Sequence, residues 1–136
     1  MSPATADELG KLILRVSVGA MLFLHGFGKL LHGIAPIERM VMASGWPAIL
    51  AWGVYLGELI GPALMVLGIY TRLGAALATI NMCVAIMLAH RAEIFQLTPM
   101  WAWQLELQGL FLFGSLAVVF LGAGRYSLGG KGGRWN

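Results

Sequence analysis

Residues 12–31 read LILRVSVGAMLFLHGFGKLL, an apolar stretch that only Arg15, His25 and Lys29 interrupt with ionisable side chains. As an α-helix, about 20 apolar residues reach across the roughly 30 Å of hydrocarbon in a bilayer. Three more apolar stretches of similar length follow, at residues 48–69, 73–90 and 103–121. The sequence therefore predicts an all-α integral membrane protein, a bundle of four transmembrane helices.

The composition agrees with a surface that faces lipid. Hydrophobic residues make up 59% of the chain and charged residues only 11%, whereas roughly a quarter of the residues in soluble domains are charged. The basic residues are scattered singly, so we expect no nucleic-acid partner. Cys83 is the only cysteine, which excludes an internal disulfide or a dithiol pair. Its apolar neighbours favour a small core residue.

The chain length of 136 residues suits a single domain. We assign residues 1–128 to one helical domain and expect the glycine-rich tail at 129–136 to be flexible. Four spans place both termini on one side of the membrane, together with the short turn at residues 70–72. That side carries five basic residues, against two in the opposite loops, and the positive-inside rule therefore predicts cytoplasmic termini. The five are Lys11, Arg72, Arg125, Lys131 and Arg134, and the two are Arg39 and Arg91.

Gly53, Gly57 and Gly61 recur with a spacing of four along the second stretch. In lipid, such a series of small residues lets another helix approach closely. We expect a packing groove within the chain. The alternative is a homo-oligomer that forms through these three glycines.

Ionisable residues inside the apolar stretches are the candidates for function, because a charge at bilayer depth costs about 2.5–3.5 kcal/mol. At about 100° per residue, Arg15, His25 and Lys29 fall within an arc of about 80° on the first helix. One stripe facing the interior of the bundle can therefore hold all three.

The depths expected for the ionisable residues predict an outward-facing polar pocket. Its expected members are His25, Lys29, Glu58 and Glu106, with Asn81 and His90 at its edge. We expect two ion pairs there, Lys29 with Glu106 and His25 with Glu58.

Pro62 lies four residues after Glu58 in the second stretch. Proline has no backbone N–H, so it removes the helical hydrogen bond to the carbonyl of Glu58. We expect a kink or a bound water at this point.

Each polar residue also has a purely structural interpretation. Arg15 and Lys29 can anchor their helix by extending their charged ends to the headgroups. Glu58 and Glu106 can serve as counter-ions that only fix helix register, and His25 as a hydrogen-bonded packing residue. The histidines show no spacing such as H-x3-H or H-E-x-x-H, so no metal ion is predicted.

The same segments resemble a known family. The first stretch follows the pattern R…G…F…HG..K with Arg15, Gly19, Phe23, His25, Gly26 and Lys29. The second, YLGELIGPALMVLGIYTRLGA, is similar to E..GG..L.LG..TR and places Glu58, Gly61, Gly68, Thr71 and Arg72 on motif positions. The fourth ends in LGAGRYSL, similar to GPGRYSLD but with Ala123 in place of a proline. Over essentially its whole length the chain resembles the DoxX family of small bacterial and archaeal four-helix membrane proteins.

The resemblance implies a multi-pass protein of the prokaryotic inner (plasma) membrane. It also implies a membrane component of quinone-linked oxidoreduction, or of detoxification under redox or quinone stress. No haem, flavin or dithiol motif is found in the sequence, so we expect no intrinsic cofactor, a quinone or quinol as the ligand, and a soluble oxidoreductase as partner. Catalysis by this chain alone is not expected.

In that role, His25 and Glu58 are the candidates for handling protons, since imidazole and carboxylate groups transfer them readily. Lys29 and Glu106 are the candidates for holding the ligand, with Asn81 and His90 beside them. Two alternatives stay open. One is a small transporter or permeation unit for a lipophilic or weakly acidic solute, and the other is a membrane scaffold for a soluble oxidoreductase.

Overall fold

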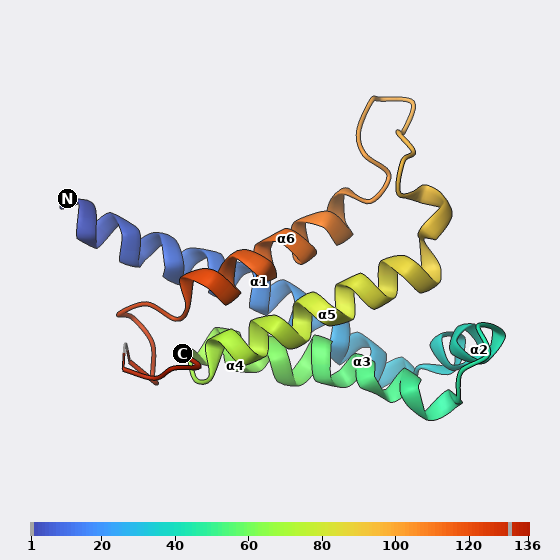
Figure 1. Ribbon diagram of the computed structural model, residues 1–136, viewed down its shortest axis with the longest axis horizontal. Coiled ribbons are helices and arrows are strands. Elements are labelled where there is room, and N and C mark those ends of the chain that lie inside the picture. Colours follow the sequence, from blue (N-terminus) through green and yellow to red (C-terminus); the bar gives the residue numbers. More distant parts are fainter. Residues whose placement is uncertain (1, 131) are drawn as a thin grey trace.

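The computed structural model describes residues 2–130 and 132–136, and within them it contains helices but no β-strand (Figure 1). Lys131, which entered the prediction of membrane orientation, lies outside the described residues, as does Met1. An isolated bridge pairs Leu97 with Trp103 in the loop before the last helix. The all-α class predicted from the sequence is confirmed.

Helix α1, Pro3–His32, begins well before the apolar stretch from which it was predicted. Ser2 caps it by accepting a hydrogen bond from the backbone N–H of Thr5 at 3.2 Å, and a proline occupies its first turn. It ends at His32, and the capping residue Gly33 has a φ of 84°. Its buried residues recur with helical spacing and so form one face. They include Arg15, Val18, Gly19, Leu22 and Gly26.

A second long helical stretch, Ala48–Leu67, changes geometry along its length. It consists of η1 (Ala48–Trp52), a 3₁₀ segment, then α3 (Gly53–Tyr55), η2 (Leu56–Ile60), a π-helical turn, and α4 (Gly61–Leu67). The backbone N–H of Gly61 donates to the carbonyl of Leu56, five residues back. The irregularity expected beside Glu58 therefore takes the form of a π-helical turn directly before Pro62.

Short turns and one long loop connect the remaining helices. Helix α2, Ala35–Ala43, lies between α1 and η1. Gly68 and Tyr70, with φ values of 73° and 47°, form the tight turn that reverses the chain into α5, Thr71–Ala89. After η3, Arg91–Glu93, the chain reaches α6, Glu106–Leu121.

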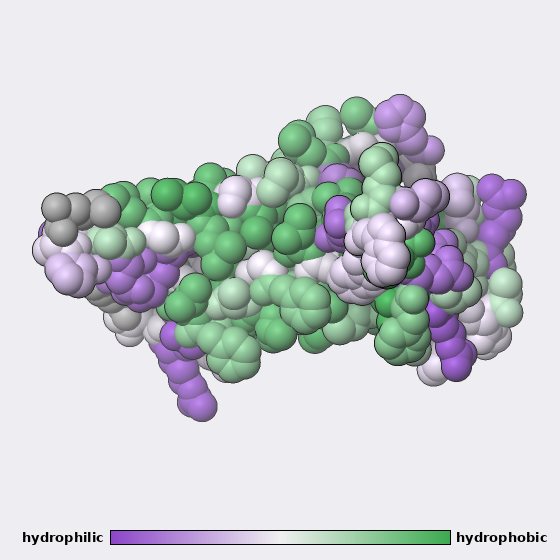
Figure 2. Space-filling view, turned by 90° about the horizontal axis from the view of Figure 1, so that it is seen from above, coloured by the Kyte–Doolittle hydropathy of each residue, from purple (hydrophilic) through white to green (hydrophobic). Residues whose placement is uncertain are grey.

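In the part of the chain that the structure describes, three helical stretches are long and apolar enough to cross a membrane: Pro3–His32, Ala48–Leu67 and Thr71–Ala89. Helix α6 is apolar but has only 16 residues, because Trp103, the predicted start of the fourth span, pairs with Leu97 outside the helix. Figure 2 shows hydrophobic residues across the middle of one face, with hydrophilic residues gathered toward its two ends. Such a wide exposed apolar surface is typical of a membrane protein.

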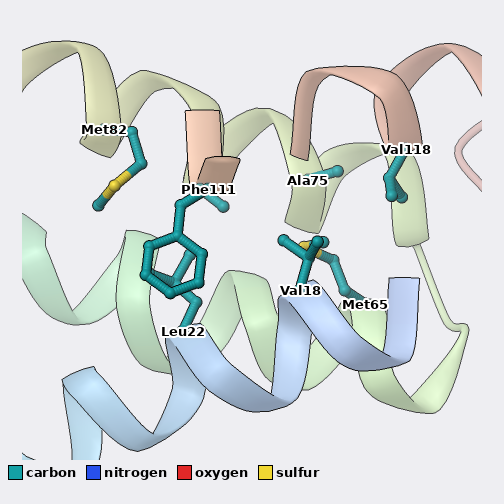
Figure 3. Packing of buried hydrophobic residues seen from close by; sticks show 8 residues of the cluster. Val18, Leu22, Met65, Ala75, Met82, Phe111 and Val118 are labelled. Carbon is teal, nitrogen blue, oxygen red and sulfur yellow. The ribbon is translucent and has the colours of Figure 1, made fainter. Parts of the chain in front are cut away.

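Both chain termini and the turn between α4 and α5 lie toward one end of the molecule, which we call the terminal end (Figure 1). Helix α2 and the loop before α6 lie toward the opposite end. Side chains from α1, α4, α5 and α6 meet between the ends in one core (Figure 3). Its members are Val18, Leu22, Met65, Ala75, Ala78, Met82, Phe111 and Val118.

Buried hydrogen bonds tie the terminal end together. Arg15 is almost fully buried, and its guanidinium donates to the backbone carbonyls of Met65, Val66, Ala123 and Tyr126. The interpretation of Arg15 as an anchor in the headgroups is therefore wrong: it joins the C-terminal end of α4 to the segment after α6.

The tail was predicted to be flexible, and that stays a prediction, but its last residue makes defined contacts. The side-chain oxygen of Asn136 accepts a hydrogen bond from the Thr71 hydroxyl at 3.0 Å. Arg72 donates to the backbone oxygen of Asn136 at 3.1 Å and to that of Val119 at the same distance. Arg72, placed on a motif position by the resemblance, thus links α5 to α6 and to the tail.

The three glycines of the second span have different surroundings. A Cβ at Gly61 would lie 2.6 Å from the carbonyl oxygen of Gly74 on α5, and a Cβ at Gly57 would collide with the side chain of Asn81. A Cβ at Gly53 would meet nothing within 4 Å. Gly57 and Gly61 therefore serve packing within the chain, and a second copy could reach only Gly53.

We predict that Gly61→Ala lowers the stability of the protein while Gly53→Ala does not. The added methyl at position 61 must push α4 away from α5, and such overpacking costs about 1–3 kcal/mol. The methyl at position 53 enters open space, and alanine favours the helix by up to about 1 kcal/mol. Thermal unfolding in detergent, followed by circular dichroism, measures both, and equal melting temperatures for the two variants would contradict the packing described.

Candidate functional site

A buried carboxylate lies at the junction of three helical segments. Glu58, in the π-helical turn η2, is only 3% exposed. One of its oxygens, Oε2, forms an ion pair with Nζ of Lys29 on α1. The other, Oε1, accepts a hydrogen bond from Nδ2 of Asn81 on α5 at 3.2 Å. Both oxygens of the carboxylate are thereby satisfied, as a buried charge requires.

Two glycines allow the three segments to come this close. A Cβ at Gly26 on α1 would collide with the backbone carbonyl of Glu58, and a Cβ at Gly57 would collide with the side chain of Asn81. The hydroxyl of Tyr55 donates to the backbone oxygen of Lys29 at 3.3 Å and adds another link between α1 and the second span. Glycine at these two positions therefore lets the charged groups meet, because it carries no side chain that would hold the segments apart.

The cluster of Lys29, Glu58 and Asn81 lies on the wall of a cavity of about 440 Å³. His90, at the C-terminal end of α5, also lines this cavity. The rest of the wall is almost entirely apolar and comes from α2, the second span and α5. An apolar cavity of roughly 300–1,000 Å³ with a few convergent polar groups is typical of a small-molecule site. We call this the polar cavity.

His90 has polar neighbours of its own. Its Nδ1 lies 3.0 Å from a carboxylate oxygen of Glu93 in η3, and its Nε2 lies 3.5 Å from the side-chain nitrogen of Gln108 on α6. The imidazole therefore sits between the loop and the last helix at the cavity wall. The structure thus places His90 and Asn81, the two residues expected at the edge of the pocket, on the same cavity wall as Lys29 and Glu58.

Two other predicted members lie elsewhere. His25 is exposed on α1, where its Nδ1 lies 3.0 Å from the carbonyl oxygen of Met21 and its ring meets Phe111 edge-on at 5.3 Å. Glu106 is exposed at the start of α6. Neither lines the polar cavity. The predicted ion pairs are wrong, because Lys29 is the partner of Glu58.

Sequence reasoning missed some neighbours of the site. Tyr55 gave no signal, being one aromatic residue among many apolar ones. Glu93 was assigned to a loop, although its spacing of three from His90 could have suggested the pair. Cys83 was interpreted as a core residue, but it is exposed and lines a second cavity beside the polar one.

The cluster of Lys29, Glu58 and Asn81 can donate hydrogen bonds to a polar ligand group and can also accept them from it. An ammonium group has three N–H donors, and the Lys29 side chain remains 31% exposed beside its partner. The carboxylate of Glu58 and the amide oxygen of Asn81 are acceptors. Among residues 2–130 and 132–136, no group of three or more His, Cys, Asp or Glu side chains could hold a metal ion.

We predict that Lys29→Met destabilises the protein and that Glu58→Gln, added to it, restores stability. The single change leaves a buried carboxylate without its counter-charge, which costs roughly 3 kcal/mol, whereas removing both charges is often nearly neutral. Lys11→Met is the control, because Lys11 pairs with the exposed Asp7 on the same helix at 2.6 Å and such pairs contribute less than about 1 kcal/mol. Unfolding in detergent measures all three variants. A double variant no more stable than Lys29→Met would contradict the pairing.

Comparison with known proteins agrees with the family resemblance. A protein of Haemophilus influenzae named "Uncharacterized protein" is 34% identical to this chain over 118 residues, 87% of each protein. The Bacillus subtilis (strain 168) protein named "Putative oxidoreductase CatD" is 33% identical over 79 residues, 58% of each. No solved structure matches the chain.

The family model described as DoxX matches residues 10–91, which include α1 from Gly10 onward, α2, the second span and α5. The matched region thus contains Lys29, Glu58, Asn81 and His90, the four polar residues of the cavity wall. Since the match covers more than half of the chain, this membrane protein belongs to the DoxX family.

Proposed function

We propose that this protein is a membrane component of quinone-linked oxidoreduction or of detoxification under quinone and redox stress, and that the polar cavity binds the quinone ring. The observation that carries the proposal is a buried carboxylate, bridged by an ammonium and an amide group, on the wall of an otherwise apolar cavity. The similarity to a Bacillus subtilis protein named as an oxidoreductase supports it.

Both oxidation states of a quinone match the groups at the cavity wall. A quinone oxygen accepts hydrogen bonds, and N–H groups of Lys29 and Asn81 supply them. A quinol hydroxyl donates, and the carboxylate of Glu58 accepts. Reduction consumes protons as well as electrons, and Glu58 and His90 are the wall residues that exchange protons. His25 takes no direct part, because it does not line the cavity.

The electrons come from outside this chain. Cys83 is the only cysteine in the sequence, so the chain cannot supply a dithiol. A soluble oxidoreductase that reaches the membrane surface is the partner required. In this arrangement the membrane protein holds and protonates the quinone, and the partner reduces it.

In the proposed arrangement the protein crosses a prokaryotic cell membrane four times with both termini in the cytoplasm. Helix α6 is the fourth span: its 16 residues rise about 24 Å at about 1.5 Å per residue, and the bilayer thins locally to meet it. Its wide apolar exposure, as at Leu110, Phe113 and Phe120, supports this placement. The polar cavity then opens in the outer half of the membrane.

Reporter fusions test the four spans and the orientation. We expect a green fluorescent reporter fused after Asn136 to fluoresce, because it stays in the cytoplasm, and alkaline phosphatase inserted after Pro99 to be active, because it is exported. Alkaline phosphatase fused after Asn136 serves as the control and should be inactive. Activity at both positions would mean an odd number of spans, and the proposed topology would be wrong.

The binding of a quinone to the purified protein in detergent tests the function. We expect saturable binding of tetramethylbenzoquinone, a fully substituted ring without a tail, to the wild type. Glu58→Gln and Lys29→Gln should each weaken it at least tenfold, because each removes a charged group from the cavity wall. His25→Ala is the matched control and should bind like the wild type, with the fold of all variants checked by circular dichroism.

Loss of binding in His25→Ala with normal binding in Glu58→Gln would favour the assignment made from sequence and contradict a site at the polar cavity. Absence of binding to the wild type at ligand concentrations that saturate quinone-binding proteins would overturn the proposed function itself.

A further inference from the structure

A second cavity adjoins the polar one and has a different character. It has a volume of about 510 Å³, and no charged residue lines it. Trp46, before η1, and Cys83 and Met87, on α5, line this cavity but not the polar one. We call it the apolar cavity.

The two cavities share one wall. Val41 of α2, Leu50 of η1, and Val84 and Leu88 of α5 line both of them. Four of the seven residues around the apolar cavity are therefore also residues of the polar cavity. The two cavities therefore lie directly beside each other, with these side chains between them.

The charged groups and Asn81 line only one of the two neighbouring cavities. Asn81 and Glu58 line the polar cavity. Cys83 and Met87 lie about 120–160° round α5 from Asn81, at about 100° per residue, and line only the apolar cavity. Cys83, Met87 and Trp46 are exposed, and in a membrane this exposure faces hydrocarbon. A space that is polar at one side, apolar at the other and open to lipid matches an amphiphile rather than a compact polar solute.

We propose that the natural ligand is an amphiphile with a flexible hydrocarbon tail, its ring held at Lys29 and Glu58 and its tail lying in the apolar cavity against Cys83 and Met87. This inference rests on the proposed function for the identity of the ring. The shared wall argues that the occupant of the apolar cavity is the tail of the same molecule. The competing occupant is an acyl chain of the bilayer.

The position of the tail is a better observable than the total affinity. Lipid tails are as apolar as the side chains that line the cavity, so moving a hydrocarbon tail from bilayer to cavity yields little free energy. Binding in the cavity instead brings the tail into contact with the side chains of the cavity wall. Cys83, as the only cysteine and a member of the wall, reports that contact through its rate of alkylation.

The experiment measures alkylation of Cys83 by N-ethylmaleimide in nanodiscs, followed by mass spectrometry. The probes are tetramethylbenzoquinone, a fully ring-substituted benzoquinone with a decyl tail, and decanol, which has the tail but no ring. Full substitution of the rings prevents direct addition of the thiol. We expect the tailed quinone to slow alkylation at least fivefold and the other two probes to leave it unchanged.

One variant, Met87→Trp, tests the apolar cavity itself, and two variants at Leu73 serve as controls for general effects of the tailed quinone. In Cys83→Ser/Leu73→Cys, the cysteine lies on the same helix at another exposed position that lines neither cavity, and no probe should protect it. Met87→Trp fills the apolar cavity and should reduce the protection of Cys83 by the tailed quinone severalfold, while binding of tetramethylbenzoquinone stays unchanged. Leu73→Trp should change neither.

The outcomes separate the two proposals. If both quinones bind and depend on Glu58 but Cys83 is not protected, the tail does not enter the apolar cavity: this inference is overturned and the proposed function stands. Equal protection by decanol would assign the cavity to any hydrocarbon chain and would also overturn it. If neither quinone binds, the proposed function fails first.

Discussion

The carboxylate of Glu58 is a buried charge in the membrane-spanning part of the protein, and the arrangement around it depends on how that charge is compensated. An unpaired carboxylate in such surroundings is too costly to keep. Lys29 and Asn81 each satisfy one oxygen, and in doing so they join α1 and α5 to the second span. Gly26 and Gly57 bring the backbones close enough for these side chains to reach the carboxylate.

The location of the ion pair also bears on its role. A buried ion pair is a weak source of stability, and well-packed apolar residues often do as well or better. In this protein the pair lies on a cavity wall, and the ammonium side of it stays partly exposed. The π-helical turn that carries Glu58 is a feature common at functional sites. Together these observations fit a binding role better than a purely structural one.

The terminal end of the molecule uses buried polar groups differently. Arg15 is compensated by backbone carbonyls rather than by a carboxylate, and Arg72 likewise donates to backbone oxygens. Neither arginine lines the polar or the apolar cavity. These contacts hold the C-terminal end of α4 and the segment after α6 in place. One end of the bundle is therefore closed by hydrogen bonds, whereas the other surrounds cavities beneath α2.

The length and apolar character of residues 12–31 were enough to predict a membrane helix, because about 20 apolar residues match the bilayer. Lys29, Glu58, Asn81 and His90 were also candidates from the sequence, since polar groups at that depth need compensation. The ion-pair partner of Glu58 could not be predicted from the sequence. An arc of about 80° on an ideal helix holds His25 as well as Lys29, and only the rotation of α1, set by the contact of Gly26 with Glu58, decides which one faces the carboxylate.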